Sequence, residues 1–238
     1  MTQEVFDNLV RGRWPFRRSV FFEQTQRAGV ESVPLVMMVS FFLGLTMALL
    51  TGYQLRTFGT ERLVPRLVAT AFSRELGPLM TGIVLAARIG AAYTAELGTM
   101  TVSEEVEAIE AMGIGPLRFL VAPRLASLVL LQPCLVVLSN LAANIGACLI
   151  CATSLNIAFD YYLQLIQQGL LVKDIVAGIF KSVIFGHIIG LVACYRGLTV
   201  KGGAAGVGVS TTASVVSSIT AVIAADTVIN IILVRVYD

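Results

Sequence analysis

The sequence predicts an all-α integral membrane protein, and three observations lead to this fold class. Of the 238 residues, 56% are hydrophobic and only 13% are charged, against about 25% charged residues in soluble proteins. The mean hydropathy is +0.83. The apolar residues gather in five stretches, each near the roughly 20 residues that a helix needs to cross a bilayer. Helices are expected there, because open strands would leave backbone groups unpaired in lipid.

We place the five spans at residues 33–53, 76–97, 125–151, 172–195 and 209–234. The connection at 54–75 is expected to be either an amphipathic helix or an outward extension of the second span. No internal repeat or long linker is present, so residues 33–238 are expected to form one membrane domain. Residues 1–32 interleave aromatic and basic side chains, which favours an amphipathic helix in the headgroup region. No short apolar run with a small-residue cleavage site is found there, so no removable signal peptide is expected.

The distribution of lysine and arginine predicts the orientation. These residues are more numerous near the span ends on the side that holds the N-terminus. The N-terminus and the loop at 100–123 are therefore expected in the cytoplasm. The net charge of +2 and the absence of a basic run argue against nucleic acid as a partner. All four cysteines lie in apolar segments, so buried side chains are favoured over a metal or redox site.

A short acidic helix is expected in the connection after the second span. Thr101 and Glu104 have the spacing of a capping box, and glutamates in the first turn complement the helix dipole. Gly113 suits a left-handed stop, and Pro116 prevents continuation. Such a helix is too short to be stable alone, so it needs a surface to pack against.

The same helix carries an apolar stripe beside its acidic residues. Val102, Val106 and Ile109 lie on one face, with Met112 next to them. An exposed stripe of this kind favours a partner's groove, and the glutamates argue against anionic headgroups. We expect the contact with a protein partner to be made by Ser103, Glu104, Val106, Glu107, Ile109, Glu110, Met112 and Gly113.

Arg88, Lys181 and Asp226 lie inside the expected spans, where charges are costly and tend to be functional. Lys181 lies nine residues and Asp226 eight residues from the assumed outer ends of spans four and five. At about 1.5 Å per residue they reach nearly the same depth, so we expect them to pair. Arg88 would lie roughly 4–5 Å deeper by the same rise. A structural ion pair and a role in a transport cycle both fit these positions.

Other features of the spans leave two interpretations open. Gly82, Ala86 and Gly90 form a small-residue face, which suits close helix contact either across a dimer or within the chain. His187 is the only histidine, and nothing places it against Ser210 as a protease would require. The first span carries a soft apolar surface that suits either acyl chains of a bound lipid or ordinary lipid-facing packing. Its members are Met37, Met38, Phe41, Phe42 and Met47.

Several motifs resemble those of the MlaE/YrbE permeases, which are membrane subunits of ABC transporters that move phospholipids between bacterial membranes. They are Arg-Glu-Leu-Gly-Pro at 74–78, Ala-x-Arg-x-Gly at 86–90, Thr-Ala-Glu-Leu-Gly-x-Met at 94–100, Glu-Ala-Met-Gly-Ile at 110–114, Ala-Pro-Arg at 122–124 and Lys-Ser-Val-Ile-Phe-Gly at 181–186. The resemblance covers nearly the whole chain and is densest at residues 74–124.

The resemblance implies a homodimer in the bacterial inner membrane, with an N-terminal interfacial helix, five transmembrane helices and a lipid cavity between subunits. It makes the helix at 103–112 a coupling helix for a cytoplasmic ATPase, which binds ATP and Mg. It also implies a periplasmic lipid-binding partner with an MCE domain. Within this chain it makes Arg88, Glu96, Lys181 and Asp226 a charged network that governs the cavity, and it implies no catalytic residue and no bound cofactor or metal.

Three alternatives remain beside this interpretation. A permease for another hydrophobic or polar solute would use the buried charges to bind its cargo. An intramembrane enzyme is disfavoured, because the sequence has no Ser-His motif and no cluster of Asp and His. A scaffold would only anchor the ATPase.

Overall fold

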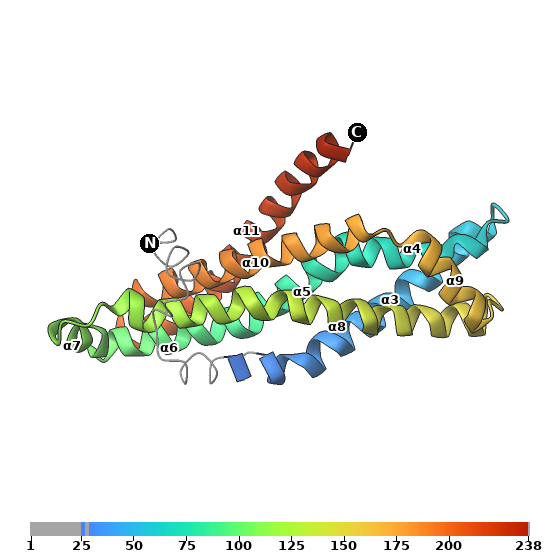
Figure 1. Ribbon diagram of the computed structural model, residues 1–238. Helices are drawn as coiled ribbons and strands as arrows, with labels where there is room; N and C mark the ends of the chain where they lie inside the picture. The colour runs from blue at the N-terminus through green and yellow to red at the C-terminus, as the bar shows by residue number, and fades with distance from the viewer. Residues whose placement is uncertain (1–24, 27–28, 238) are drawn as a thin grey trace. The chain divides into compact units, whose positions relative to one another are not determined.

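The computed structural model describes residues 25–26 and 29–237, and these residues contain helices and no strand (Figure 1). Five helical stretches are long and apolar enough to cross a membrane: Val30–Arg56, Glu61–Val102, Leu117–Ser154, Val172–Leu198 and Gly203–Arg235. The predicted all-α class and its five spans are therefore confirmed. Most of the interfacial helix predicted over residues 1–32 lies outside the described residues.

The helices are numbered as in Figure 1. Their bounds are α3 (Val33–Arg56), α4 (Val64–Ala71), α5 (Gly77–Leu85), α6 (Ala91–Val102), α7 (Glu105–Ala111), α8 (Ala122–Ser154), α9 (Phe159–Gly169), α10 (Val172–Leu198) and α11 (Gly203–Tyr237). Short 3-10 turns precede α3 and α4, and π-helical segments occupy Phe72–Leu76, Ala86–Gly90 and Leu117–Val121.

The second span is longer than its apolar core. The 3-10 turn Glu61–Leu63, α4, α5 and α6 run on through two π-helical segments as one 42-residue helical stretch, Glu61–Val102. Of the two forms expected for the connection at 54–75, the structure shows the extension of the second span. Pro78 does not end the helix, because the π-helical segment Phe72–Leu76 directly precedes it and accommodates the missing N–H donor.

The chain divides into two compact units. Unit 1 comprises the described residues up to Glu31, Leu85–Leu131 and the chain from Ile184 onward. Unit 2 comprises Ser32–Val84 and Gln132–Val183. α6, α7 and α11 thus belong to unit 1, and α3, α4, α5 and α9 belong to unit 2.

In unit 2, α3 and α8 meet along a seam of small residues. Val36, Ser40, Gly44, Ala48 and Gly52 are buried at every fourth position of α3. A Cβ at Gly44 would collide with the backbone of Ala143, and one at Gly146 would collide with the backbone at Phe41. The hydroxyls of Ser40 and Ser139 lie 2.7 Å apart across the seam. Small side chains therefore let the two backbones touch, as in other membrane helix pairs.

Also in unit 2, α9 packs against α4. Tyr162 of α9 is buried in an apolar cluster with Val64, Val68 and Phe72. Its hydroxyl donates to the carbonyl oxygen of Asn144 at 3.0 Å. Burial raises the pKa of the Tyr162 phenol above its usual 10.0, so the side chain remains a neutral donor.

In unit 1, α6 packs chiefly against α11. Thr94 Oγ1 lies 2.8 Å from Ser214 Oγ and 3.1 Å from the carbonyl oxygen of Ala193 in α10. The buried face of α11 repeats every fourth residue through Ser214, Ser218, Val222 and Asp226. The Ser214 hydroxyl on this face bonds to Thr94 of α6, and Thr94 also bonds to α10, so three helices are held together by polar as well as apolar contacts.

Candidate functional site

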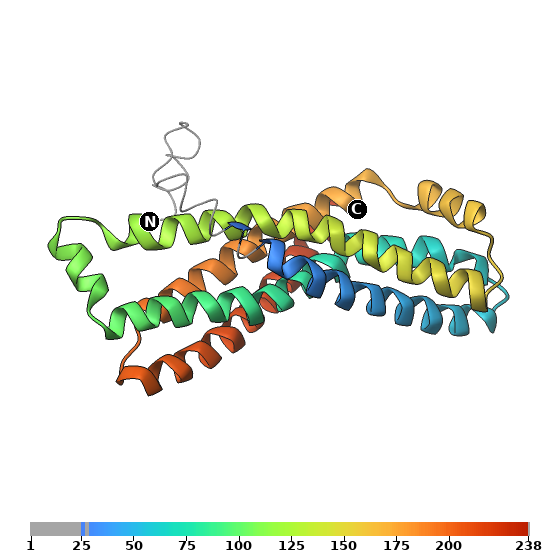
Figure 2. The same cartoon turned by 90° about the horizontal axis from the view of Figure 1, so that it is seen from below.

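α7 lies at the turn where the chain passes from α6 to α8 (Figure 2). The predicted capping box does not form, and that expectation is wrong. α6 continues to Val102, so Thr101 stays inside it and donates to the carbonyl oxygen of Leu97 at 2.8 Å. The chain instead turns at Glu104, whose φ of 61° is left-handed and which makes no side-chain cap hydrogen bond.

The end of α7 is formed as predicted. Gly113 has a left-handed φ of 76°. Its N–H donates to the carbonyl oxygen of Glu110 at 2.9 Å, and the N–H of Ile114 donates to that of Ile109 at 3.2 Å. This pair of bonds is a Schellman motif, in which glycine takes the left-handed position without a Cβ clash.

The apolar stripe of α7 is only partly exposed. Val106 and Ile109 are half-buried and pack on a cluster that includes Leu97, Leu120 and Cys194. The expectation that this part of the stripe is exposed is therefore wrong. The reason is that α7 lies close against the ends of its flanking helices, where those side chains cover an apolar surface of the same chain.

What α7 presents outward is acidic, with an apolar tip. Glu104, Glu105, Glu107 and Glu110 are exposed, and so are Met112 and Ile114 at the end of the turn. We call these six residues the α7 face. Of the residues predicted to contact a partner, Ser103 and Gly113 are also exposed, whereas Val106 and Ile109 serve chiefly to hold the helix in place.

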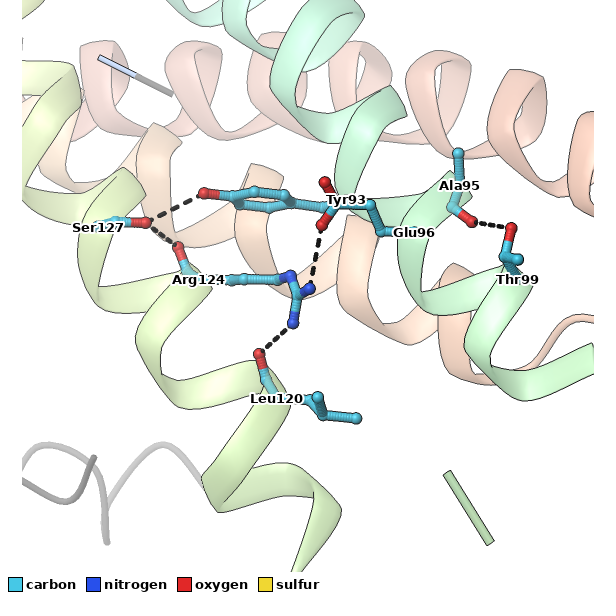
Figure 3. A network of polar contacts seen from close by, with 7 residues as sticks. All are labelled: Tyr93, Ala95, Glu96, Thr99, Leu120, Arg124 and Ser127. Atoms are coloured by element: carbon cyan, nitrogen blue, oxygen red, sulfur yellow. Dashed lines mark hydrogen bonds and ion pairs between the residues drawn. The ribbon is translucent and has the colours of Figure 1, made fainter. Parts of the chain in front are cut away.

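A polar network ties α6 to α8 close to α7 (Figure 3). The buried Arg124 of α8 forms an ion pair with Glu96 of α6, with 3.0 Å between Nη2 and Oε2. Its Nη1 donates to the carbonyl oxygen of Leu120 at 2.9 Å, and its guanidinium carbon lies 5.7 Å from the centre of the Tyr93 ring. The hydroxyls of Tyr93 and Ser127 lie 3.1 Å apart. We call Tyr93, Glu96, Arg124 and Ser127 the hairpin base.

Sequence reasoning selected Glu96 but not Arg124 as its partner. One feature of the sequence could have indicated this ion pair: Glu96 precedes the connection between α6 and α8, and Arg124 follows it. Arg88 has a different partner: its Nη2 lies 3.2 Å from Glu31 Oε2, and its Nη1 donates to the Glu31 carbonyl oxygen. Among the contacts of the described residues, Arg88 and Glu96 therefore belong to separate ion pairs.

Lys181 has a partner that the sequence did not indicate. Its side chain is fully buried and forms an ion pair with Glu75 of the π-helical segment Phe72–Leu76. Asp226 is also buried, and Asn230 Nδ2 lies 3.4 Å from its Oδ2. Lys181 and Asp226 fall in different units, so their pairing stays a prediction.

The first span turns its large side chains away from its small-residue seam. Met38 and Phe42 are more than half exposed, and Met37, Phe41 and Met47 are half-buried. The rings of Phe41 and Phe42 meet edge to face, 5.5 Å apart. All five are apolar side chains of α3, and their contact with a bound lipid stays a prediction.

The small-residue face of the second span is explained by contacts within the chain in at least one place. Gly82, Ala86 and Gly90 are all buried. A Cβ at Gly90 would lie 3.4 Å from Ile189 Cγ2 of α10.

Five spanning helices and a short connecting helix with an exposed acidic face define a multi-pass membrane protein with a surface suited to a partner. The chain belongs to the Permease MlaE family, which matches residues 21–232. A probable ABC transporter permease of Rickettsia typhi is 35% identical over 86% of this chain and 79% of its own length. One from Synechocystis is 33% identical over 93% and 84%. The chloroplastic protein trigalactosyldiacylglycerol 1 of Arabidopsis thaliana is 33% identical over 95% and 64%. The chain is thus an ABC transporter permease, a class that works with a separate ATPase.

Proposed function

We propose that this chain is the membrane-spanning subunit of an ABC transporter that moves phospholipids or related lipids between bacterial membranes. A separate cytoplasmic ATPase binds ATP and Mg and supplies the driving force. The chain itself performs no covalent chemistry. The α7 face carries this proposal, because it is an exposed contact surface on a helix that the rest of unit 1 holds in place.

The composition of the α7 face indicates what docks there. Its four glutamates repel anionic lipid headgroups, so the membrane surface is a poor partner. Its apolar tip, Met112 and Ile114, suits a groove in a protein. A groove with a basic rim would match both the charge and the apolar residues. With a cytoplasmic ATPase docked at this face, α7 lies in the cytoplasm. The N-terminus then lies there too, because two spans separate it from α7. The membrane of this proposal is the bacterial inner membrane.

A lipid is favoured as the cargo over a polar solute. The buried Lys181 and Arg124 both have carboxylate partners within the chain, so their charges are already balanced. The surface of α3 presents Met38 and Phe42, which suit acyl chains. The name of the Arabidopsis relative contains that of a glycolipid, which agrees with a lipid cargo.

The remaining parts of the proposal concern assembly. Two copies of the chain form the lipid cavity between them, and a periplasmic protein with an MCE domain receives or delivers the lipid. The ion pairs of Arg88, Glu96 and Lys181, together with Asp226, then stabilise one state of the cavity relative to the other. Ionisable groups inside a membrane commonly have such roles.

The proposal is tested by purifying the chain with the ATPase encoded beside it. We expect phospholipid in the purified complex by mass spectrometry. Glu110→Lys and Met112→Asp on the α7 face are expected to release the ATPase, because they oppose the charge and the apolar contact. Asp160→Lys changes the same kind of exposed charge on α9 and serves as the control. A complex that contains no phospholipid and keeps its ATPase in both α7 variants would contradict the proposal.

A further inference from the structure

The hairpin base joins the two helices between which α7 is held. Glu96 and Tyr93 come from α6, which leads into α7, and Arg124 and Ser127 come from α8, which follows it. The ion pair Arg124–Glu96 and the hydroxyl contact Tyr93–Ser127 are two separate connections between the same pair of helices (Figure 3). Two connections at different levels restrict rotation as well as separation of the helices.

Arg124 also fixes the junction between the α7 turn and α8. The segment Leu117–Val121 is π-helical, so its carbonyl groups are out of register with ordinary α-helical donors. Arg124 Nη1 donates to one of them, that of Leu120. Ser127 in turn donates to the carbonyl oxygen of Arg124 at 2.8 Å. The start of α8 is therefore stiffened by side chains where its own backbone bonding is irregular.

α7 is attached to this stiffened base by apolar contacts. Val106 and Ile109 of α7 pack on a buried cluster that contains Leu97 of α6 and Leu120 just before α8. The same cluster includes Cys194 of α10. A force on α7 is therefore transferred to α6, α8 and α10 through these packed side chains.

A buried guanidinium is costly unless its geometry is well satisfied. The Arg124 guanidinium makes three contacts, with the Glu96 carboxylate, the Leu120 carbonyl oxygen and the Tyr93 ring. Its Nε has no hydrogen-bond partner among the described residues. An apolar residue would fill this position at lower cost if packing were the only requirement, which indicates that the connection to α6 is what the position needs.

We infer that Arg124 and Glu96 are positioning residues that make α6, α7 and the start of α8 move as one body, so that displacement of α7 is passed to the membrane spans. This inference rests on the proposed function, in which an ATPase docks on α7. Loss of the ion pair lets α7 move without the spans. The transporter then hydrolyses ATP but moves less lipid for each ATP.

The test uses the complete transporter in lipid nanodiscs or proteoliposomes, with Glu96→Gln and Glu96→Leu as variants. Gln keeps an oxygen for Arg124 and removes the charge, whereas Leu removes both. Glu96 is partly exposed, so both replacements are tolerated sterically. Thr99→Val is the matched control, because Thr99 lies on the same helix and its hydroxyl donates to the carbonyl oxygen of Ala95 within that helix (Figure 3).

Three quantities are measured: ATPase retention, ATP hydrolysis, and transfer of a fluorescent phosphatidylethanolamine per ATP. We expect retention and hydrolysis to persist while transfer per ATP falls about tenfold in Glu96→Leu and less in Glu96→Gln, a size typical of coupling between sites. Thr99→Val keeps the wild-type ratio. A wild-type ratio in Glu96→Leu overturns the inference, and so does release of the ATPase from that variant.

A second measurement does not depend on the cargo. Hydrogen exchange is compared with and without a non-hydrolysable ATP analogue. In the wild type we expect the nucleotide to change the exchange rates of residues 105–111 and also those of residues 91–102. In Glu96→Leu we expect the change in exchange rate to be confined to α7. Equal spread in both proteins overturns the inference while leaving the proposed function intact. Failure of the wild-type chain to hold any ATPase contradicts the proposed function itself.

Discussion

Lys181 and Glu75 form an ion pair in which the lysine side chain is fully buried and the glutamate side chain is 32% exposed. The pair joins α10 to the π-helical segment Phe72–Leu76 within unit 2. Because a buried ammonium needs a counter-charge, this contact fixes the register between the second and fourth spans.

Removal of Glu75 is expected to destabilise the protein. Glu75→Gln leaves the buried Lys181 with a weaker partner, and breaking a buried pair costs about 3 kcal/mol. Partial exposure of Glu75 reduces this figure. Thermal unfolding of the purified chain in detergent measures the loss. Lys181→Met added to Glu75→Gln should recover part of it, and strictly additive effects would show that the two residues do not interact.

Asp226 provides a separate test of the predicted pairing with Lys181. If the two interact, Asp226→Asn destabilises the protein or slows its cycle, and Lys181→Met in the same chain partly restores it. The double-mutant cycle is read from unfolding temperature and from lipid transfer. Additivity in both would remove this pairing and leave Glu75 as the partner that matters.

Gly44 is expected to tolerate no side chain. A Cβ there would overlap the backbone of Ala143, so Gly44→Leu must force α3 and α8 apart at a cost of about 2 kcal/mol or more. Gly208→Ala is the control, because nothing lies within 4 Å of that position in α11. The unfolding temperature of each purified variant measures the effect. Equal temperatures for the two would contradict the close approach of the helices.

The stop of α7 gives a prediction about backbone conformation alone. Gly113 has a φ of 76° and open space around it, so Gly113→Ala introduces strain of about 1 kcal/mol without any clash. Gly115 is equally open and has no positive φ, which makes Gly115→Ala its control. We expect limited proteolysis to cleave the α7 turn faster only in Gly113→Ala. Equal cleavage would mean that the left-handed stop is not needed.

Tyr162 predicts a loss of stability in alkali. Its pKa is raised in the folded protein, so the unfolded chain loses its proton first as the pH rises past 10.0. The stabilising contribution of the neutral phenol is therefore complete below that pH and declines above it. Unfolding temperatures at about pH 8 and about pH 11 should differ less in Tyr162→Phe than in the wild type. Tyr161→Phe, at the exposed neighbouring position, should keep the wild-type difference.

Hydropathy was sufficient to predict the spans, because length and apolarity determine which segments cross a bilayer. It failed at the edge of the second span, where Arg74 and Glu75 resemble a connection. The charge of Glu75 is neutralised by Lys181, which is far away in the sequence, so the residues around Glu75 do not predict this contact. The ion pair between Arg124 and Glu96 could not be predicted from neighbouring residues either.

The α7 region shows the same division between local and tertiary information. Its stop at Gly113 was predictable, because a left-handed glycine is a local requirement. Its start was not, because the length of α6 decides whether Thr101 faces α7 or remains in the preceding helix. The outward direction of Glu107 and the inward direction of Ile109 depend on the cluster beneath them.

The seam between α3 and α8 leaves no passage between these two helices. Gly44 and Gly146 bring the two backbones into contact, and the hydroxyls of Ser40 and Ser139 close the space between them. An acyl chain is far wider than this contact allows. No molecule as wide as an acyl chain can therefore pass between α3 and α8 along this seam.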